Sequence, residues 1–214
     1  MQIILFGAPG VGKGTQAKIL SQKYSIKHIS TGDILRDSIA RETESGLAAK
    51  EVVERGDLVS DNLMGGLVKE TLCNMDYKKG FILDGFPRTI EQCKLLDGIF
   101  EELKIDTPYF IILKADTEII VNRLTNRRLC TECAIIVNKK DLKGSNICPN
   151  CGAVDTCIKR EDDKKKVVRK RLNIYRDTTF PVIDYYKDKY TLAILNGTDP
   201  IEMVTQKIME ILSK

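Results

Sequence analysis

The sequence predicts an α/β fold in which a five-stranded, mainly parallel sheet is flanked by helices on both faces. Five short apolar runs could form the strands, and helical patterns lie between most of them. These runs are residues 3–6, 28–29, 81–83, 109–113 and 192–195. Strands that alternate with helices are typical of parallel sheets. With 214 residues, 43% of them hydrophobic, the chain can bury one core with small appended segments but hardly three equal domains.

The first apolar run leads directly into a glycine-rich turn, GAPGVGKGT, which begins at Gly7. In such a turn Gly7 and Gly12 let backbone N–H groups point inward at a phosphate, while the ammonium group of Lys13 reaches the outer phosphates. A helix that starts near Thr15 adds the positive end of its dipole. The strict motif has Ser or Thr directly after the lysine, whereas here Gly14 takes that place. The turn predicts a P-loop nucleotide site formed by Gly10, Val11, Gly12, Lys13, Gly14 and Thr15.

Further along the chain, local signals mark the ends of several helices. The expected starts are Thr89 with Gln92 three residues later, and Asp199 with Pro200 and Glu202. Gly56 follows the charged amphipathic run 48–55 and predicts a helix end. Residues 30–59 are therefore expected to form a small helical insert between core elements.

Residues 127–160 break the alternation and carry cysteines at a metal-binding spacing. Two C-x-x-C pairs are separated by fourteen residues, and they consist of Cys130, Cys133, Cys148 and Cys151. This spacing lets four thiolates surround one tetrahedral zinc ion. So short a segment cannot bury enough surface to hold itself together, so bound metal would supply the missing folding free energy and act structurally.

Other interpretations of the cysteines stay open. Another tetrahedral thiolate-bound metal such as iron could occupy the site, and disulfides or free thiols are the remaining alternative. Cys73 and Cys93 lack any such spacing and are expected to be ordinary thiols. Cys157 lies close enough in sequence to act as a spare ligand.

Three motifs stand in order along the chain together with this cysteine-bearing insert. They are GAPGVGKGTQA, then Ser30-Thr31-Gly32-Asp33 followed by Arg36, then Asp84-Gly85-Phe86-Pro87-Arg88-Thr89 with Gln92. With these motifs the chain resembles adenylate kinase, specifically the long, zinc-bearing bacterial type, over essentially its whole length. The resemblance implies reversible transfer of the terminal phosphoryl group of MgATP to AMP, giving two ADP, in nucleotide homeostasis and salvage.

The resemblance also implies a division into three parts. Residues 1–29, 60–126 and 161–214 would form the P-loop core, residues 30–59 an AMP-binding insert, and residues 127–160 a zinc-binding lid. Both inserts are expected to fold over the nucleotides and exclude water from the reaction.

Phosphoryl transfer leaves little covalent work to the protein, so positioning and positive charge carry the catalysis. Arginine suits this task because its planar fork grips phosphate oxygens in pairs and stays ionised. The resemblance implies a catalytic set of Lys13, Asp84, Arg88, Arg123, Arg160 and Arg171. Asp84 would hold Mg²⁺ through waters. Alternatively, its carboxylate caps the turn before Gly85, and any single arginine could be a solvated surface charge.

Two nucleotide pockets follow from the same resemblance. The AMP pocket would consist of Thr31, Arg36, Asp57, Leu58, Val59, Gly85, Phe86, Pro87, Arg88, Gln92, Arg160 and Arg171. Within it, Arg36 and Arg88 would hold the phosphate and Gln92 would read the adenine edge. The P-loop residues would bind ATP together with Arg123, Arg127, Ile136, Val137, Gly197 and Asp199.

The chain departs from the family pattern in the lid. After Cys133 the family usually has a glycine, then a small hydroxyl residue and an aromatic residue beside ATP. This chain has Ala134 followed by Ile135, Ile136 and Val137, which puts the lid's contacts with ATP in question. Asn126 also stands where the family commonly has glycine, so a stiffer hinge into the lid is expected.

Charge and hydropathy restrict the partners. Residues 127–166 hold ten Lys or Arg against six Asp or Glu, a difference of +4 that equals the net charge of the whole chain. A zinc-stabilised nucleic-acid-binding module would need a larger basic surface. No stretch approaches 18 apolar residues, and the apolar start lacks the basic lead of a signal peptide, so we expect a cytoplasmic protein that does not bind membranes. No long exposed apolar stripe is evident, so we expect a monomer, and its expected partners are ATP, AMP and ADP but not nucleic acid. A kinase for UMP or CMP is the nearest alternative, against which Gln92 and the zinc insert argue.

Overall fold

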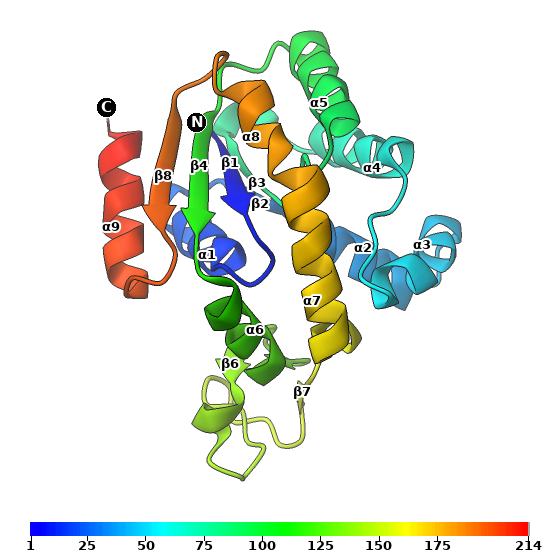
Figure 1. The fold of residues 1–214 in the computed structure, drawn as a ribbon, viewed down its shortest axis with the longest axis vertical. Coiled ribbons are helices and arrows are strands. Elements are labelled where there is room, and N and C mark those ends of the chain that lie inside the picture. The colour runs from blue at the N-terminus through cyan, green and yellow to red at the C-terminus, as the bar shows by residue number, and fades with distance from the viewer. Residues whose placement is uncertain (214) are drawn as a thin grey trace.

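A computed structural model describes residues 1–213. Five parallel strands form its central sheet in the order β2-β3-β1-β4-β8 (Figure 1). The strands are β1 (Gln2–Gly7), β2 (Lys27–Ser30), β3 (Phe81–Asp84), β4 (Tyr109–Lys114) and β8 (Leu192–Asn196). The predicted fold class is confirmed, and each predicted strand is present with one or two more residues.

Helices connect the strands and cover the sheet. They are α1 (Lys13–Tyr24), α2 (Thr31–Ala40), α3 (Glu44–Glu54), α4 (Asp61–Cys73), α5 (Ile90–Leu103), α6 (Thr117–Asn126), α7 (Lys165–Ile174), α8 (Pro181–Tyr186) and α9 (Ile201–Leu212). Shorter turns are η1 (Tyr77–Lys79), η2 (Lys139–Leu142), η3 (Glu161–Asp163) and the π-helical η4 (Tyr175–Thr179). Helix α7, η4 and α8 follow one another as one long rod across the front of the sheet (Figure 1).

Alternate residues of β1 supply the two halves of the core. Ile3 and Leu5 are buried in the cluster that contains residues of α1 and α9. Ile4 and Phe6 are buried in the cluster that contains residues of α4, α5 and α8. Because successive side chains of a strand point to opposite faces, the sheet is covered on both sides.

The helix ends agree in part with the sequence signals. The Thr89 hydroxyl accepts a hydrogen bond from the Gln92 N–H and caps α5. Gly56 adopts a φ of +77° just after α3. Helix α9 begins at Ile201 as expected, but the Asp199 carboxylate does not cap it and accepts hydrogen bonds from Asn196 and Lys207.

Two segments project from the core (Figure 1). Helices α2 and α3 form one, and they cross so closely at Gly46 that a Cβ there would clash with the Ser38 carbonyl. The other is a three-stranded sheet, ordered β6-β5-β7, below α6 in Figure 1. Its strands are β5 (Arg127–Cys130), β6 (Ile136–Asn138) and β7 (Cys157–Ile158). No helix within residues 1–213 is long and apolar enough to cross a membrane.

Candidate active site

A cleft of about 960 Å³ lies at the carboxyl ends of β1 and β3, between the core and both projecting segments. Ligands of parallel α/β sheets bind at this edge. All predicted nucleotide-contact residues line the cleft except Thr31 and Phe86. The Thr31 side chain is buried, and its hydroxyl donates to the carbonyls of Asp84 and Gly85, at 3.3 and 3.0 Å. Phe86 is buried in the core beneath the cleft.

The glycine-rich turn after β1 encloses the ammonium group of Lys13. Its Nζ atom donates to the carbonyls of Gly7 and Ala8, at 2.8 and 3.0 Å. Burial lowers the pKa of Lys13 to about 8. Gly10 and Gly12 have φ angles of +81° and +120°, which favour glycine. The turn therefore holds the desolvated ammonium group of Lys13, whose carbonyl partners carry no formal charge. A bound anion would stabilise this positive charge far more than the carbonyls do.

Arginines from several elements converge on this cation. The Nε atom of Arg88 donates to the Gly85 carbonyl at 2.7 Å. Burial, and then repulsion from Arg171, lower the pKa of Arg88 to about 10. Burial, with repulsion from Arg36 and Arg127, likewise lowers the pKa of Arg160 to about 10. These groups stay charged at neutral pH and repel one another, so the cleft carries a strong positive potential that attracts polyanions.

The Arg160 side chain is only 12% exposed. Its Nε atom is buried and has no hydrogen-bond partner among the residues that the structure describes. A buried donor without a partner is costly, and a phosphate oxygen is the acceptor that best suits a guanidinium group.

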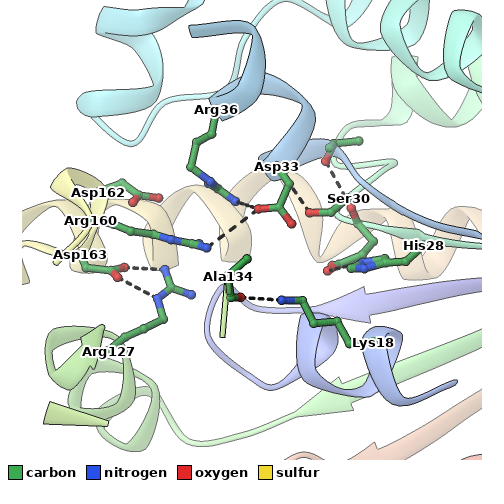
Figure 2. A network of polar contacts seen from close by, with 12 residues as sticks. Lys18, His28, Ser30, Asp33, Arg36, Arg127, Ala134, Arg160, Asp162 and Asp163 are labelled. Carbon is green, nitrogen blue, oxygen red and sulfur yellow. Dashed lines mark hydrogen bonds and ion pairs between the residues drawn. The ribbon is translucent and has the colours of Figure 1, made fainter. Parts of the chain in front are cut away.

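Buried carboxylates hold two of the arginines in place, a feature that sequence reasoning missed. Asp163, with a side-chain exposure of 0%, accepts two hydrogen bonds from Arg127, at 2.8 and 2.7 Å (Figure 2). Asp162 accepts one from Arg171 at 2.8 Å. The only sequence signal for these roles is an acidic run, 161–163, directly after Arg160 within a basic segment.

Two contacts join the projecting segments to the rest of the cleft. Asp33 on α2 lies 2.6 Å from Arg36 and 3.9 Å from Arg160, which follows β7 (Figure 2). Lys18 on α1 donates a 2.8 Å hydrogen bond to the Ala134 carbonyl in the loop between β5 and β6. Both contacts lie over the cleft, so either segment can touch a molecule bound there.

Asp84 ends β3 at the floor of the cleft. Its Oδ2 atom lies 3.5 Å from Nε2 of His28, and that nitrogen has no hydrogen-bond partner within residues 1–213. A carboxylate oxygen is the kind of ligand that Mg²⁺ prefers. The position of Asp84, beside the P-loop, therefore suits a magnesium ion that accompanies a nucleotide.

Gln92 and Arg123 already have protein partners. The Gln92 amide accepts from the Arg88 N–H at 2.7 Å and donates to Asp61 at 2.9 Å. Arg123 donates to the carbonyls of Val11 and Gly197, at 3.2 and 2.8 Å, and so ties the P-loop to the turn after β8. A base-reading role for Gln92 therefore requires it to exchange a partner.

The two lid residues predicted beside ATP differ in exposure. Ile136 is 39% exposed, whereas Val137 is buried in the small core of the β5–β7 sheet. Asn126 ends α6, and its amide donates back to the Asn122 carbonyl at 2.9 Å.

The four cysteines of the two C-x-x-C pairs form one cluster. Their sulfur atoms all lie within 4.8 Å of one another. Two separations, Cys130 to Cys151 and Cys133 to Cys148, are 3.7 Å. A tetrahedron with Zn–S bonds of about 2.3 Å has sulfur separations of about 3.8 Å. The cluster therefore fits a zinc ion. Several hydrogen bonds, of which that of the Thr156 hydroxyl has the largest effect, lower the pKa of Cys130 to about 6 and so favour its thiolate form.

The turn after β1 and the charge gathered around it define a protein of the P-loop nucleotide-binding class. Comparison with known proteins narrows this class. A family model described as adenylate kinase matches residues 5–191, and the chain belongs to this family. Its four-cysteine cluster fits the type with a zinc-binding lid.

Relatives match over the full chain. An adenylate kinase of Chloroherpeton thalassium is 46% identical over all of this chain and 98% of its own length. Adenylate kinases of Thermosipho africanus and Archaeoglobus fulgidus are 43% and 44% identical over all of this chain, and over 100% and 99% of their own lengths.

Proposed function

We propose that the chain is an ATP:AMP phosphotransferase, which moves the terminal phosphoryl group of MgATP to AMP and yields two ADP. The observation that carries this proposal is the cleft itself, where the Lys13 turn and several half-buried arginines surround a space large enough for two nucleotides. One nucleotide phosphate chain would not need so many cations. Two chains that meet end to end would.

The role proposed for each residue follows from its position in the cleft. The P-loop N–H groups and Lys13 hold the donor phosphates, and Arg123 and Arg127 approach them from α6 and β5. Arg36 and Arg88 hold the acceptor phosphate. An oxygen of that phosphate attacks the terminal phosphorus of the donor, the bond to the donor's second phosphate breaks, and the leaving oxygen keeps the electron pair.

The remaining groups stabilise the charge of this transfer. Arg160 and Arg171 neutralise the negative charge on the equatorial oxygens of the phosphoryl group in the transition state of its transfer. Magnesium, when bound with the donor, would neutralise phosphate charge, and Asp84 would orient it through waters. The proposed site needs no residue from a second copy, and we propose that the chain acts as a monomer. Four of the seven cysteines are proposed metal ligands, which must stay reduced to bind, and this supports a reducing, cytoplasmic location.

We further propose that residues 30–59 and 127–160 are mobile flaps on a core of residues 1–29, 60–126 and 161–214. Without phosphate, mutual repulsion of the arginines should favour an open cleft. A bisubstrate analogue should shorten the distances from labels at exposed Glu42 and Lys143 to a label at exposed Lys23. Unchanged distances on titration of the analogue would rule out closure.

The lid cysteines should act through stability rather than chemistry. Removal of one ligand costs several kcal/mol of metal-linked folding free energy, and each kcal/mol shifts Tm by about 2–4 °C in a chain of this size. We expect Cys130→Ser to lower Tm by about 10 °C while activity at a permissive temperature falls less. Calorimetry and rate assays test this, with the exposed thiol variant Cys73→Ser as control. Lost activity with unchanged Tm would contradict the structural role.

The lowered pKa of Lys13 predicts proton uptake on binding. In the free protein the unfolded chain holds this proton more tightly, so the contribution of Lys13 to unfolding free energy rises with pH between about 8 and 10.5. A bound phosphate should raise the pKa again. ATP binding should therefore take up more protons at pH 8.5 than at pH 7, measured by calorimetry in buffers of different ionisation enthalpy.

The matched control for this measurement is Lys13→Arg, which stays charged across the range. It should show no extra uptake at pH 8.5. An equal extra uptake in this variant would assign the proton to another group.

A coupled assay with MgATP and each of AMP, GMP, CMP and UMP tests the proposed reaction. Fast turnover with AMP alone supports it. Turnover with UMP or CMP instead would move the substrate assignment to another monophosphate, and no transfer to any of them would overturn the proposal.

A further inference from the structure

Strand β7 packs directly against the metal-binding cysteines but contributes none of the four. It pairs with β5 in antiparallel fashion, with Cys157 opposite Cys130. The Thr131 N–H donates to the Thr156 carbonyl at 2.9 Å, so these two residues form a hydrogen-bonded pair. The next pair along, Cys130 with Cys157, is then of the non-hydrogen-bonded kind, in which side chains come closest. The Cys157 side chain therefore lies on the same face of this sheet as the Cys130 side chain, within the same small core.

Thr156, the residue before β7, makes a second contact with the same ligand. Its hydroxyl oxygen lies 3.2 Å from the Cys130 sulfur. Once Cys130 is a thiolate it can only accept, so in this contact the threonine hydroxyl is the donor. The other acceptor within reach of that hydroxyl, the Ala153 carbonyl, is farther away, at 3.4 Å. Cys157 is only 5% exposed and lies outside the four-sulfur cluster, within the same small core as Cys130 and Cys148.

The chemistry of the site explains why such donors matter. Four thiolates around a divalent ion leave a net charge of about −2. Part of this charge is removed from water here, because Cys130 and Cys148 are buried whereas Cys133 is half-buried and Cys151 is exposed. Hydrogen-bond donors around the ligands offset that charge, and removal of such outer contacts typically weakens metal binding by about 10- to 100-fold.

We propose that the Thr156 hydroxyl and the Cys157 thiol form an outer hydrogen-bonding shell that stabilises the thiolate of Cys130 and slows metal loss from the lid. This inference rests on the proposed zinc site. It assigns Cys157 a positioning role beside the metal, which differs from the spare-ligand role suggested by its place in the sequence.

Paired substitutions separate this role from simple packing. Thr156→Val keeps the shape and loses the donor, and Cys157→Val loses the donor and adds about one methyl group, whereas Thr156→Ser and Cys157→Ser keep a donor and lose apolar contact. Thr131→Val is the matched control, because Thr131 is exposed in the same lid and its side chain makes no hydrogen bond within residues 1–213. A packing role predicts that the serine variants suffer more, and the proposal predicts the opposite order.

The measurement is the zinc dissociation constant of each full-length variant, by competition with a chelator of known affinity. We expect both valine variants to weaken zinc binding by about 10- to 100-fold and the serine variants to stay within about threefold. Cobalt(II) spectra should show four thiolate ligands throughout, with the charge-transfer band shifted in the valine variants.

Three outcomes would overturn the proposal. Valine variants that bind zinc like the wild type would rule out the outer shell. Serine variants that lose as much zinc affinity as the valine variants, or more, would show that loss of the donor does not explain the effect. A three-thiolate cobalt spectrum in Cys157→Val would make Cys157 a ligand. A wild-type chain that takes up no zinc would overturn the metal site itself, and this result is distinct from the other three.

Discussion

Replacing Arg88 with alanine should lower kcat by at least about a hundredfold, the order seen when a charged transition-state contact is removed. The half-buried Arg88 side chain lies at the junction of both proposed phosphate sites, and its Nε atom donates to the Gly85 carbonyl at 2.7 Å. The remaining N–H groups are thereby aimed at the cleft before any substrate arrives. Because this orientation is preformed, no other cation can take its place at low cost.

Two further variants make the test specific. Arg88→Lys keeps a charge but loses the planar fork, so its rate should still fall well below that of the wild type. Arg41→Ala removes a largely exposed arginine whose one ion-pair partner among residues 1–213 is Asp37, and it should leave kcat within a fewfold of the wild-type value. Stability of each variant is checked by thermal unfolding. An Arg88→Ala enzyme with nearly normal turnover would remove Arg88 from the catalytic set.

Local chemistry made much of the site predictable from the sequence. The P-loop could be predicted because its glycines and Lys13 act within a few residues of one another. The same holds for the cysteine cluster, because each C-x-x-C pair forms its own turn and only the meeting of the two turns depends on the fold. The five strands were predictable because buried parallel strands are short runs of apolar residues.

Long-range pairing made the rest unpredictable. Arg127 and Asp163 lie 36 residues apart, and Gln92 and Asp61 are 31 apart. Nothing in either local segment indicates its partner. The partner of Lys18 is the Ala134 carbonyl, and a backbone acceptor leaves no mark in the sequence at all. The arginines of the cleft could therefore be predicted from the sequence, whereas the carboxylates that pair with them could not.

The pair formed by Arg127 and Asp163 gives the largest expected effect on stability. Removal of one partner of a buried ion pair leaves the other charge desolvated, at a cost of about 3–5 kcal/mol. We expect Asp163→Ala to lower the free energy of unfolding by this amount, and Tm by about 10 °C. Asp177→Ala, which breaks an exposed pair with Arg176, should change it by less than about 1 kcal/mol.

Nucleotide should partly reverse this loss, and the reversal separates a positioning role from a merely structural one. Arg127 lines the cleft, so a bound phosphate can serve as the anion that Asp163 no longer supplies. Saturating ATP should then raise the Tm of Asp163→Ala by more than it raises that of the wild type. An equal ATP-induced shift in both proteins would mean that Arg127 does not reach the phosphates, and that its contact with Asp163 serves only to attach the lid to the core.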